Sequence, residues 1–191
     1  MNPPKPRMYM RGSARATIDA MTPHQIIDAL RSRFGEAILN ALPEDKHPRV
    51  HVMAERWREV AEYLRGDPAM GFDWLSCLTA VDYVAENLLC CVYDLRSTGQ
   101  GHAFAVKVFV DRATPVVPTV ADLWPAADWH EREAFDMMGI TFTGHPDLRR
   151  ILLPEDWEGY PLRKDYVFPR EYHGIPGTYE TDWKQKADYP A

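Results

Sequence analysis

Six side chains that could ligate a metal ion lie in one short stretch of the chain. They are two histidines and four carboxylates: His130, Glu131, Glu133, Asp136, His145 and Asp147. His130 and Glu133 are three residues apart, a spacing that puts both on one face of a helix and could chelate a metal ion. Zinc hydrolase helices prefer two histidines four residues apart, and the second of those positions here is Ala134. Since Arg132 lies among the acids, the sequence favours ion pairing over a metal site.

Arginines accompany these acids. Arg132 and Asp136 are four residues apart and are predicted to pair on the surface of one helix. Further along, Arg149, Arg150 and Arg163 carry planar guanidinium groups that suit two-pronged contacts with carboxylates. Two interpretations stay open. These arginines fasten the later segment to the acidic helix of the same chain, or some of them reach carboxylates of a neighbouring subunit.

The acidic helix is predicted to span residues 129–138. Asp128 is expected to cap it, with Glu131 completing a capping box, and Gly139 is expected to end it in the left-handed conformation. Helical spacing puts Glu131 in the middle of an apolar arc and His130 at its edge. Either Glu131 serves as a cap and His130 is a partly buried ring, or the helix is buried on two sides, one of them formed by another protein.

A long segment without regular structure is predicted after this helix. It begins with a short strand at residues 140–143 and continues through the helix breakers Gly144, Pro146, Pro154, Gly159 and Pro161. Its large apolar residues are Leu148, Ile151, Leu152, Leu153, Trp157 and Leu162. Because the segment has neither helix nor sheet in which to bury them, we expect it to lie along a surface that already exists.

The same stretch resembles the signature of the C subunit of the proton-pumping NADH:quinone oxidoreductase, respiratory complex I. The residues that carry the resemblance are Glu131-Arg132-Glu133, Asp136-Met137-Met138, His145, Arg149, Ile151-Leu152, the run from Gly144 to Arg150, and the run from Pro161 to Asp165. The resemblance covers about residues 50–165 and is strongest after Trp129.

The resemblance implies a non-catalytic structural subunit of the hydrophilic arm, beside the D and B subunits and peripheral on the cytoplasmic face of the bacterial inner membrane. The whole enzyme passes electrons from NADH through FMN and iron–sulfur clusters to quinone and pumps protons, and no cofactor is expected in this chain. The residues expected to serve at an interface or in its structure are Glu131, Arg132, Glu133, Asp136, His145, Asp147, Arg149, Arg150, Trp157, Arg163 and Lys164. Two alternatives stay open: the matching subunit of a related membrane hydrogenase or ferredoxin-linked complex, and a stand-alone metal-dependent hydrolase.

Other sequence features agree with a chain that has no reaction of its own. Rossmann, Walker and nucleophile-elbow motifs are absent, and Gly99-Gln100-Gly101 lies between two predicted strands with no helix behind it. The three cysteines are too few for an iron–sulfur cluster, which usually takes four thiolates, and are expected to be free and buried. The net charge is −6, and no basic stripe is present, so nucleic acid is not an expected partner. No apolar run could span a bilayer, so we expect membrane contact only through the complex.

The remaining chain is predicted to fold as an α+β two-layer sandwich, a mixed sheet with helices on one face. The element order is helix, two strands, helix and three strands, followed by the acidic helix and the irregular extension. Helices are expected at residues 23–34 and 54–65, a helical turn at 119–124, and strands at 36–42, 49–53, 72–82, 88–96 and 102–111.

Three regions are predicted along the chain. Residues 1–20 form a flexible basic arm, either a frayed tail or an arm resting on an acidic partner or lipid surface. Residues 21–138 form the α+β core domain. Residues 139–191 form an extended segment that packs on partner subunits. Its last part, residues 169–191, is expected to be ordered only against a partner, because it buries too little apolar surface to offset the entropy of folding.

Overall fold

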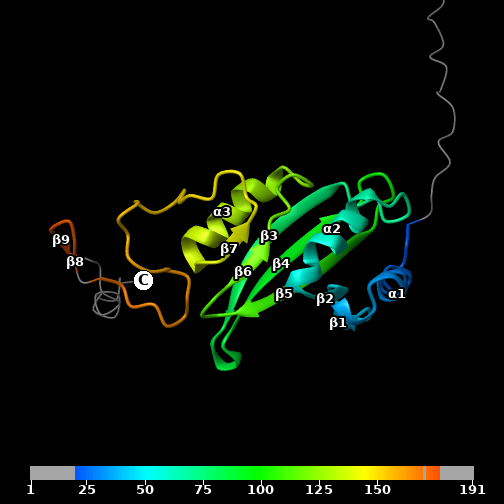
Figure 1. Cartoon of the computed structure of the whole chain (residues 1–191), viewed down its shortest axis with the longest axis horizontal. Coiled ribbons are helices and arrows are strands. Elements are labelled where there is room, and N and C mark those ends of the chain that lie inside the picture. Colours follow the sequence, from blue (N-terminus) through cyan, green and yellow to red (C-terminus); the bar gives the residue numbers. More distant parts are fainter. Residues whose placement is uncertain (1–19, 170, 177–191) are drawn as a thin grey trace, which may run out of the picture.

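A five-stranded mixed sheet is the centre of the computed structural model, which describes residues 20–169 and 171–176 (Figure 1). The strands are β1 (Ile38–Leu42), β2 (Arg49–Met53), β3 (Trp74–Tyr83), β4 (Leu88–Arg96) and β5 (Ala103–Asp111). Their spatial order is β1-β2-β5-β4-β3, with β2 and β5 parallel and all other neighbours antiparallel. The predicted basic arm and most of the predicted C-terminal tail lie outside the described residues.

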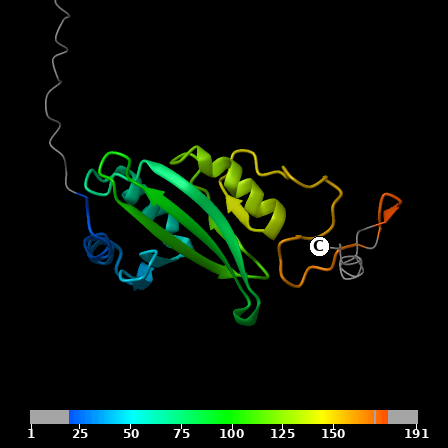
Figure 2. The same cartoon turned by 180° about the vertical axis from the view of Figure 1, so that it is seen from behind.

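The side chains of the sheet alternate between a buried face and an open face. On β4 the buried face carries Leu89, Cys91, Tyr93 and Leu95, which are almost completely inaccessible to solvent. From behind, the strands face the viewer and α2 lies on their far side (Figure 2). This alternation is what the sequence predicts for a sheet that is covered on one side only.

The helices lie on the buried face of the sheet. They are α1 (Pro23–Phe34), α2 (Trp57–Gly66) and α3 (Ala126–Met138), with short 3₁₀ helices at Gly35–Ala37, Ala54–Arg56 and Val84–Glu86. The ring of Trp57 on α2 packs 4.4 Å from the ring of Tyr93. Thr22 and Gln25 form the predicted capping box at the start of α1. The predicted α+β class and element order are confirmed. No described helix has the length and apolar character needed to cross a membrane.

A second, two-stranded parallel sheet joins β6 (Val116–Pro118) to β7 (Thr141–Thr143). β7 lies within the predicted strand at residues 140–143, whereas β6 was not predicted because three residues are too few to establish an alternation. The pairing of β6 with β7 brings the turn that follows β6 against α3.

The start of α3 differs from the prediction. The helix begins at Ala126, after Pro125, which makes no side-chain capping bond. Asp128 therefore lies inside the first turn, and Glu131 cannot complete a capping box there. The helix starts early because the preceding turn leads directly into it, with the amide of Ala127 bonded to the carbonyl of Trp124 at 2.8 Å.

Residues 145–169, called the ribbon from here on, contain no helix or strand. Figure 1 shows the ribbon returning past α3 and then running beyond the sheet to the small hairpin of β8 (Glu171–Tyr172) and β9 (Ile175–Pro176). The ribbon is held to the rest of the chain by polar contacts with buried acids.

Candidate functional site

Asp136 on α3 is the centre of the contacts that hold the ribbon. Its side chain is fully buried, and Oδ2 accepts hydrogen bonds from the amides of Ile151, Leu152 and Leu153 at 3.0, 2.7 and 3.0 Å. Oδ1 accepts one from the guanidinium of Arg150 at 2.9 Å. Burial alone would raise the pKa of this carboxyl, but the four donors outweigh burial and hold the pKa below its usual value. Asp136 is therefore an ionised group around which the ribbon folds.

Two arginines extend this attachment from the ribbon side. Arg150 also donates to the carbonyl of Trp157 at 3.2 Å. Arg163 Nε donates to the carbonyl of Met138 at 2.8 Å, where the end of α3 leaves carbonyls without helical partners. The guanidinium of Arg163 lies 4.8 Å from the centre of the Tyr160 ring. These two predicted site arginines thus fasten the ribbon to the acidic helix of the same chain.

Gly139 ends α3 in the left-handed conformation, as predicted, with φ of 74°. A Cβ at this position would lie 2.5 Å from the ring of Tyr160, inside van der Waals contact. The ribbon therefore packs so closely on the end of the helix that only glycine fits there.

A second buried acid, Asp82 at the end of β3, holds a later part of the ribbon. Its carboxylate accepts hydrogen bonds from Arg112 Nε at 2.9 Å and from the amide of Lys164 at 2.9 Å. Burial opposes ionisation, but Arg112 and the Lys164 amide together hold the pKa of Asp82 below its usual value. Arg112 also pairs with Asp165 on the ribbon. Lys164 acts here through its amide, since its side chain is exposed.

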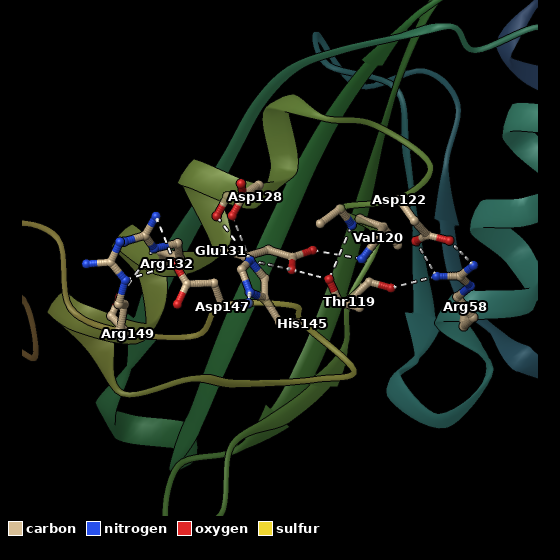
Figure 3. A network of polar contacts seen from close by, with 11 residues as sticks. Arg58, Thr119, Val120, Asp122, Asp128, Glu131, Arg132, His145, Asp147 and Arg149 are labelled. Carbon is tan, nitrogen blue, oxygen red and sulfur yellow. Dashed lines mark hydrogen bonds and ion pairs between the residues drawn. The ribbon is translucent and has the colours of Figure 1, made fainter.

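Glu131 is the centre of a different polar network on α3 (Figure 3). Its side chain is fully buried, and it accepts hydrogen bonds from the hydroxyl of Thr119 and from the amide of Val120, the latter at 2.8 Å. Burial raises the pKa of Glu131 to about 7, although both hydrogen bonds act in the other direction. Glu131 thus binds the turn after β6 and does not cap its own helix.

His145 links the start of the ribbon to the first turn of α3. Its Nδ1 accepts a hydrogen bond from the amide of Asp147 at 3.1 Å, so Nε2 carries the proton and donates to the carbonyl of Asp128 at 3.2 Å. Nε2 also lies 3.9 Å from the Glu131 carboxylate. Both ring nitrogens of this fully buried side chain are engaged, so His145 positions the backbone on either side of it.

Arg132 and Asp136 do not form the predicted ion pair; each binds the ribbon instead. Arg132 Nε lies 3.4 Å from the carbonyl of Arg149, and its guanidinium lies 3.9 Å from Asp147 and 4.8 Å from the Trp129 ring centre. Asp147 is bound more closely by Arg149 Nε, at 2.8 Å. The prediction was wrong because the ribbon covers this side of the helix, which leaves both predicted partners buried and not at the surface.

The remaining candidates are not gathered into one site. Glu133 is exposed on α3, and His130 is half-buried. Among the described residues, no group of three or more His, Cys, Asp and Glu side chains is arranged to hold a metal ion. The three cysteines are free, with Cys90 and Cys91 buried and Cys77 only partly so. The arrangement as described supports attachment of the ribbon.

Four residues of these networks were not singled out in the sequence: Asp82, Arg112, Thr119 and Asp128 in its role as a partner of His145. Asp82 had a recognisable signal, because even spacing from Leu78 puts an acid on the buried face of β3. Such a position predicts a cation or amide partner from elsewhere in the chain. The identity of that partner depends on the tertiary fold.

Large apolar side chains of the ribbon are exposed. They include Leu152, Leu162, Val167 and Phe168, with exposed fractions of 60, 58, 85 and 64%. An apolar surface of this kind on a polar-anchored segment is typical of a protein interface.

Comparisons with known proteins agree with this geometry. Residues 50–172 match the family model described as respiratory-chain NADH dehydrogenase, 30 Kd subunit. The C subunit of the NADH-quinone oxidoreductase of Chlorobium phaeobacteroides (strain DSM 266 / SMG 266 / 2430) is 46% identical over 154 residues, which are 80% of this chain and 93% of that protein.

Two solved structures are similar in fold. The trypsin-resistant fragment (1-134) of Nqo5 has a TM-score of 0.55 and 30% identity, and the match covers 67% of this chain and 100% of that one. A chain of the membrane-bound sulfane sulfur reductase (MBS), an archaeal respiratory membrane complex, has a TM-score of 0.64 and 26% identity, covering 75% of this chain and 85% of that one.

Proposed function

The chain belongs to the family of the 30 Kd subunit of respiratory-chain NADH dehydrogenase, and from this premise we propose that it is a structural subunit of the hydrophilic arm of an NADH-quinone oxidoreductase. It holds neighbouring subunits, chiefly the D and B subunits, while FMN and the iron–sulfur clusters are carried by other chains. The assembled enzyme passes electrons from NADH to quinone and translocates protons. This chain is peripheral, on the cytoplasmic face of the bacterial inner membrane.

One observation carries the proposal: the ribbon is fixed on its inner side and exposes large apolar side chains, among charged ones, on its outer side. The amide of Leu152 is bound to buried Asp136 at 2.7 Å, while the Leu152 side chain is 60% exposed. The backbone of the ribbon is therefore positioned before a partner arrives, which lowers the entropy lost on binding. A segment that is ordered by polar anchors and exposes both large apolar and charged side chains is suited to support another protein.

The two interpretations of the arginines both apply within this proposal. Arg150 and Arg163 point to α3 and fasten the ribbon. Arg149 has a side chain that is 69% exposed, and among the described residues it pairs only through its Nε, with Asp147. Its remaining donors are available to a carboxylate of a neighbouring subunit.

Leu152→Asp tests this function. Because the side chain is exposed, the free energy of unfolding of the isolated variant should lie within about 0.5 kcal/mol of that of the parent. An added charge in an apolar interface should prevent partner subunits from binding. We expect intact complex in membranes to be lost, with little change in the melting temperature of the isolated chain.

Val116→Asp is the matched control, because it puts the same charge on an apolar side chain that is 44% exposed on β6, which contacts α2 on the helix side of the sheet. It should leave both stability and assembly unchanged. Normal amounts of intact complex from Leu152→Asp would contradict the scaffold function.

The match to the sulfane sulfur reductase complex favours a second candidate, the corresponding scaffold subunit of a related membrane complex. The identity of 46% to the C subunit of an NADH-quinone oxidoreductase favours the first. The proteins that co-purify with the chain discriminate between them, since flavin-bearing NADH-oxidising subunits belong only to the first.

A further inference from the structure

The face of the sheet turned away from the helices carries a continuous set of half-buried side chains, called the open face from here on. It includes His51, Met53, Val81, Tyr83, Val92, Lys107 and Phe109, from β2, β3, β4 and β5, and the same face continues to the exposed Thr79 and Asp94. Strand register places them side by side, with Val92 opposite Lys107 and Lys107 opposite His51. In Figure 2 this face is turned to the viewer, and no described helix crosses it.

The open face is largely apolar. The ring of Phe109 lies 5.0 Å from the ring of His51 and 5.6 Å from the ring of Tyr83, which gives a connected aromatic surface across β2, β5 and β3. Met53, which lies opposite Phe109 in the register, is 37% exposed. Apolar side chains from four adjacent strands gather here, whereas solvent-facing sheets usually alternate to polar residues on the outer face.

Lys107 is the one cation at the centre of this apolar surface. Its ammonium lies 3.3 Å from the hydroxyl of Tyr83 and 5.9 Å from the centre of that ring. Within the part of the chain that the structure describes, no carboxylate lies within ion-pair distance of it. Lys107 is half-buried as a residue, and its ammonium gives the open face a positive charge that a carboxylate would complement.

His51 adds a buried polar atom to the open face. Its Nε2 is buried and makes no hydrogen bond with any described residue. Burial, together with Lys107 and Arg49, lowers the pKa of His51, so the ring is neutral at pH 7 and offers one donor or acceptor. Two polar groups surrounded by apolar side chains match the composition of an interface core more than that of a solvated surface.

Charge argues against two possible occupants of the open face: a second copy of this chain, and the basic N-terminal residues of the chain itself. A second copy bound symmetrically would put one Lys107 against another, and like charges in an interface repel. The N-terminal residues 1–15 contain four basic residues and no acid, so they would also be repelled. The complementary occupant is an apolar surface with an acidic side chain.

We propose that the open face is a second interface, which binds an apolar surface of a neighbouring subunit that carries one carboxylate opposite Lys107. The inference rests on the proposed function, since it requires a multi-subunit assembly. It adds a contact on the face of the sheet that the helices leave uncovered, separate from the ribbon.

Photo-crosslinking in the assembled complex tests the inference. A benzophenone amino acid is placed at position 92 on the open face or at position 162 on the ribbon, in the full chain. We expect both positions to crosslink to other subunits. A crosslink from position 162 alone would overturn this inference and leave the scaffold function standing, whereas no crosslink from either position would contradict the scaffold function itself.

The identity of the crosslinked product also decides the occupant. A product of position 92 with another subunit supports the inference. A product with a second copy, or with the tail of the same chain, would overturn it.

Substitutions of Lys107 test the predicted carboxylate. Lys107→Glu should weaken binding of the partner at least about thirtyfold, because it brings two carboxylates together, while Lys107→Arg should retain binding. Arg31→Glu makes the same change of charge on exposed α1 and should have no effect. Equal recovery of complex from Lys107→Glu and Arg31→Glu, with both isolated chains folded by circular dichroism, would overturn the inference.

Discussion

Two buried acids on the same helix differ in charge because they differ in their donors. Asp136 receives three amide hydrogen bonds and one guanidinium, and these hold its pKa below the usual value. Glu131 receives one hydroxyl and one amide, both neutral, and burial raises its pKa to about 7. Both carboxyl groups are buried, but a cation and several amides keep Asp136 ionised. Glu131 accepts from no cation among the described residues and titrates near neutral pH.

Asp136→Asn should destabilise the chain by about 3 kcal/mol, since it leaves the partly buried guanidinium of Arg150 without its carboxylate and weakens three amide hydrogen bonds. Chemical denaturation followed by circular dichroism measures the loss. Glu133→Gln, an equivalent change at an exposed position of the same helix, should cost less than about 0.5 kcal/mol. Equal effects of the two substitutions would show that the ribbon does not depend on Asp136.

Glu131 should make stability depend on pH in the direction opposite to Asp136. In the folded chain Glu131 keeps its proton up to a pKa of about 7, whereas in the unfolded chain it loses the proton near 4.5. The folded state therefore binds more protons between these values, and the free energy of unfolding falls as pH rises through this window. The shift corresponds to roughly 3 kcal/mol.

Glu131→Gln removes this titration while keeping the shape: its amide oxygen can still accept from the amide of Val120, and its nitrogen can donate to the hydroxyl oxygen of Thr119. All other titrating groups are the same in variant and parent. The free energy of unfolding of the variant, relative to that of the parent, should therefore rise by roughly 3 kcal/mol from pH 4.5 to pH 8. Urea denaturation across this range measures the difference. Two stability curves that run parallel would contradict the protonation of buried Glu131.

The end of α3 is the element on which the position of the ribbon depends. Gly139→Ala puts a Cβ at φ of 74° and 2.5 Å from the ring of Tyr160. We expect it to lower the free energy of unfolding by about 2 kcal/mol or more. Gly66→Ala, at the end of α2 with normal φ and no atom within 4 Å, should instead stabilise by roughly 0.5 kcal/mol. Thermal unfolding of both variants measures these changes in stability. If Gly139→Ala leaves the stability unchanged, Tyr160 does not pack against this position.

Elements whose boundaries depend on local sequence were predictable. The two predicted capping boxes show the limit of such predictions, because one forms and the other does not. Thr22 with Gln25 forms its capping box, where Pro23 fixes the first helical position. Asp128 with Glu131 has an equivalent spacing and forms no box. There the preceding turn is held by Trp124, whose Nε1 donates to a backbone carbonyl of the core at 2.9 Å, and the helix continues from that turn. A cap signal thus fails where tertiary packing sets the start of the helix.

The candidate site was predictable in its residue types but not in its pairs. Spacing along α3 predicted a bond between Arg132 and Asp136, because only neighbours on a helix can be derived from sequence. In the structure Asp136 binds residues 150–153, and Asp82 binds Lys164 across 82 positions of sequence. Such partners follow from the path of the ribbon, which carries no periodicity from which contacts could be deduced.

The molecule as a whole consists of a packed sheet-and-helix core and a ribbon attached by a few polar anchors. The core buries the large apolar side chains on the helix-facing side of β2, β4 and β5 against those of α2. The ribbon, by contrast, leaves many of its apolar side chains exposed and is joined to the core mainly through Asp136, Asp82 and the end of α3. Local stability follows buried apolar contacts, so the two parts should open with different free energies.

Hydrogen exchange should detect this difference at individual amides. In the isolated chain the amides of residues 151–153 should exchange at least about a hundredfold faster than that of Val108 in the central strand pair, because they need only local release from Asp136 to open. If a partner covers the outer side of the ribbon in the assembled complex, as we propose, exchange at residues 151–153 should become slow there, while Val108 is slow in both states. Mass spectrometry of peptic fragments measures both. If exchange at residues 151–153 is equally fast in the isolated and assembled chain, the apolar side chains of the ribbon face solvent in the complex, and the ribbon does not support a partner.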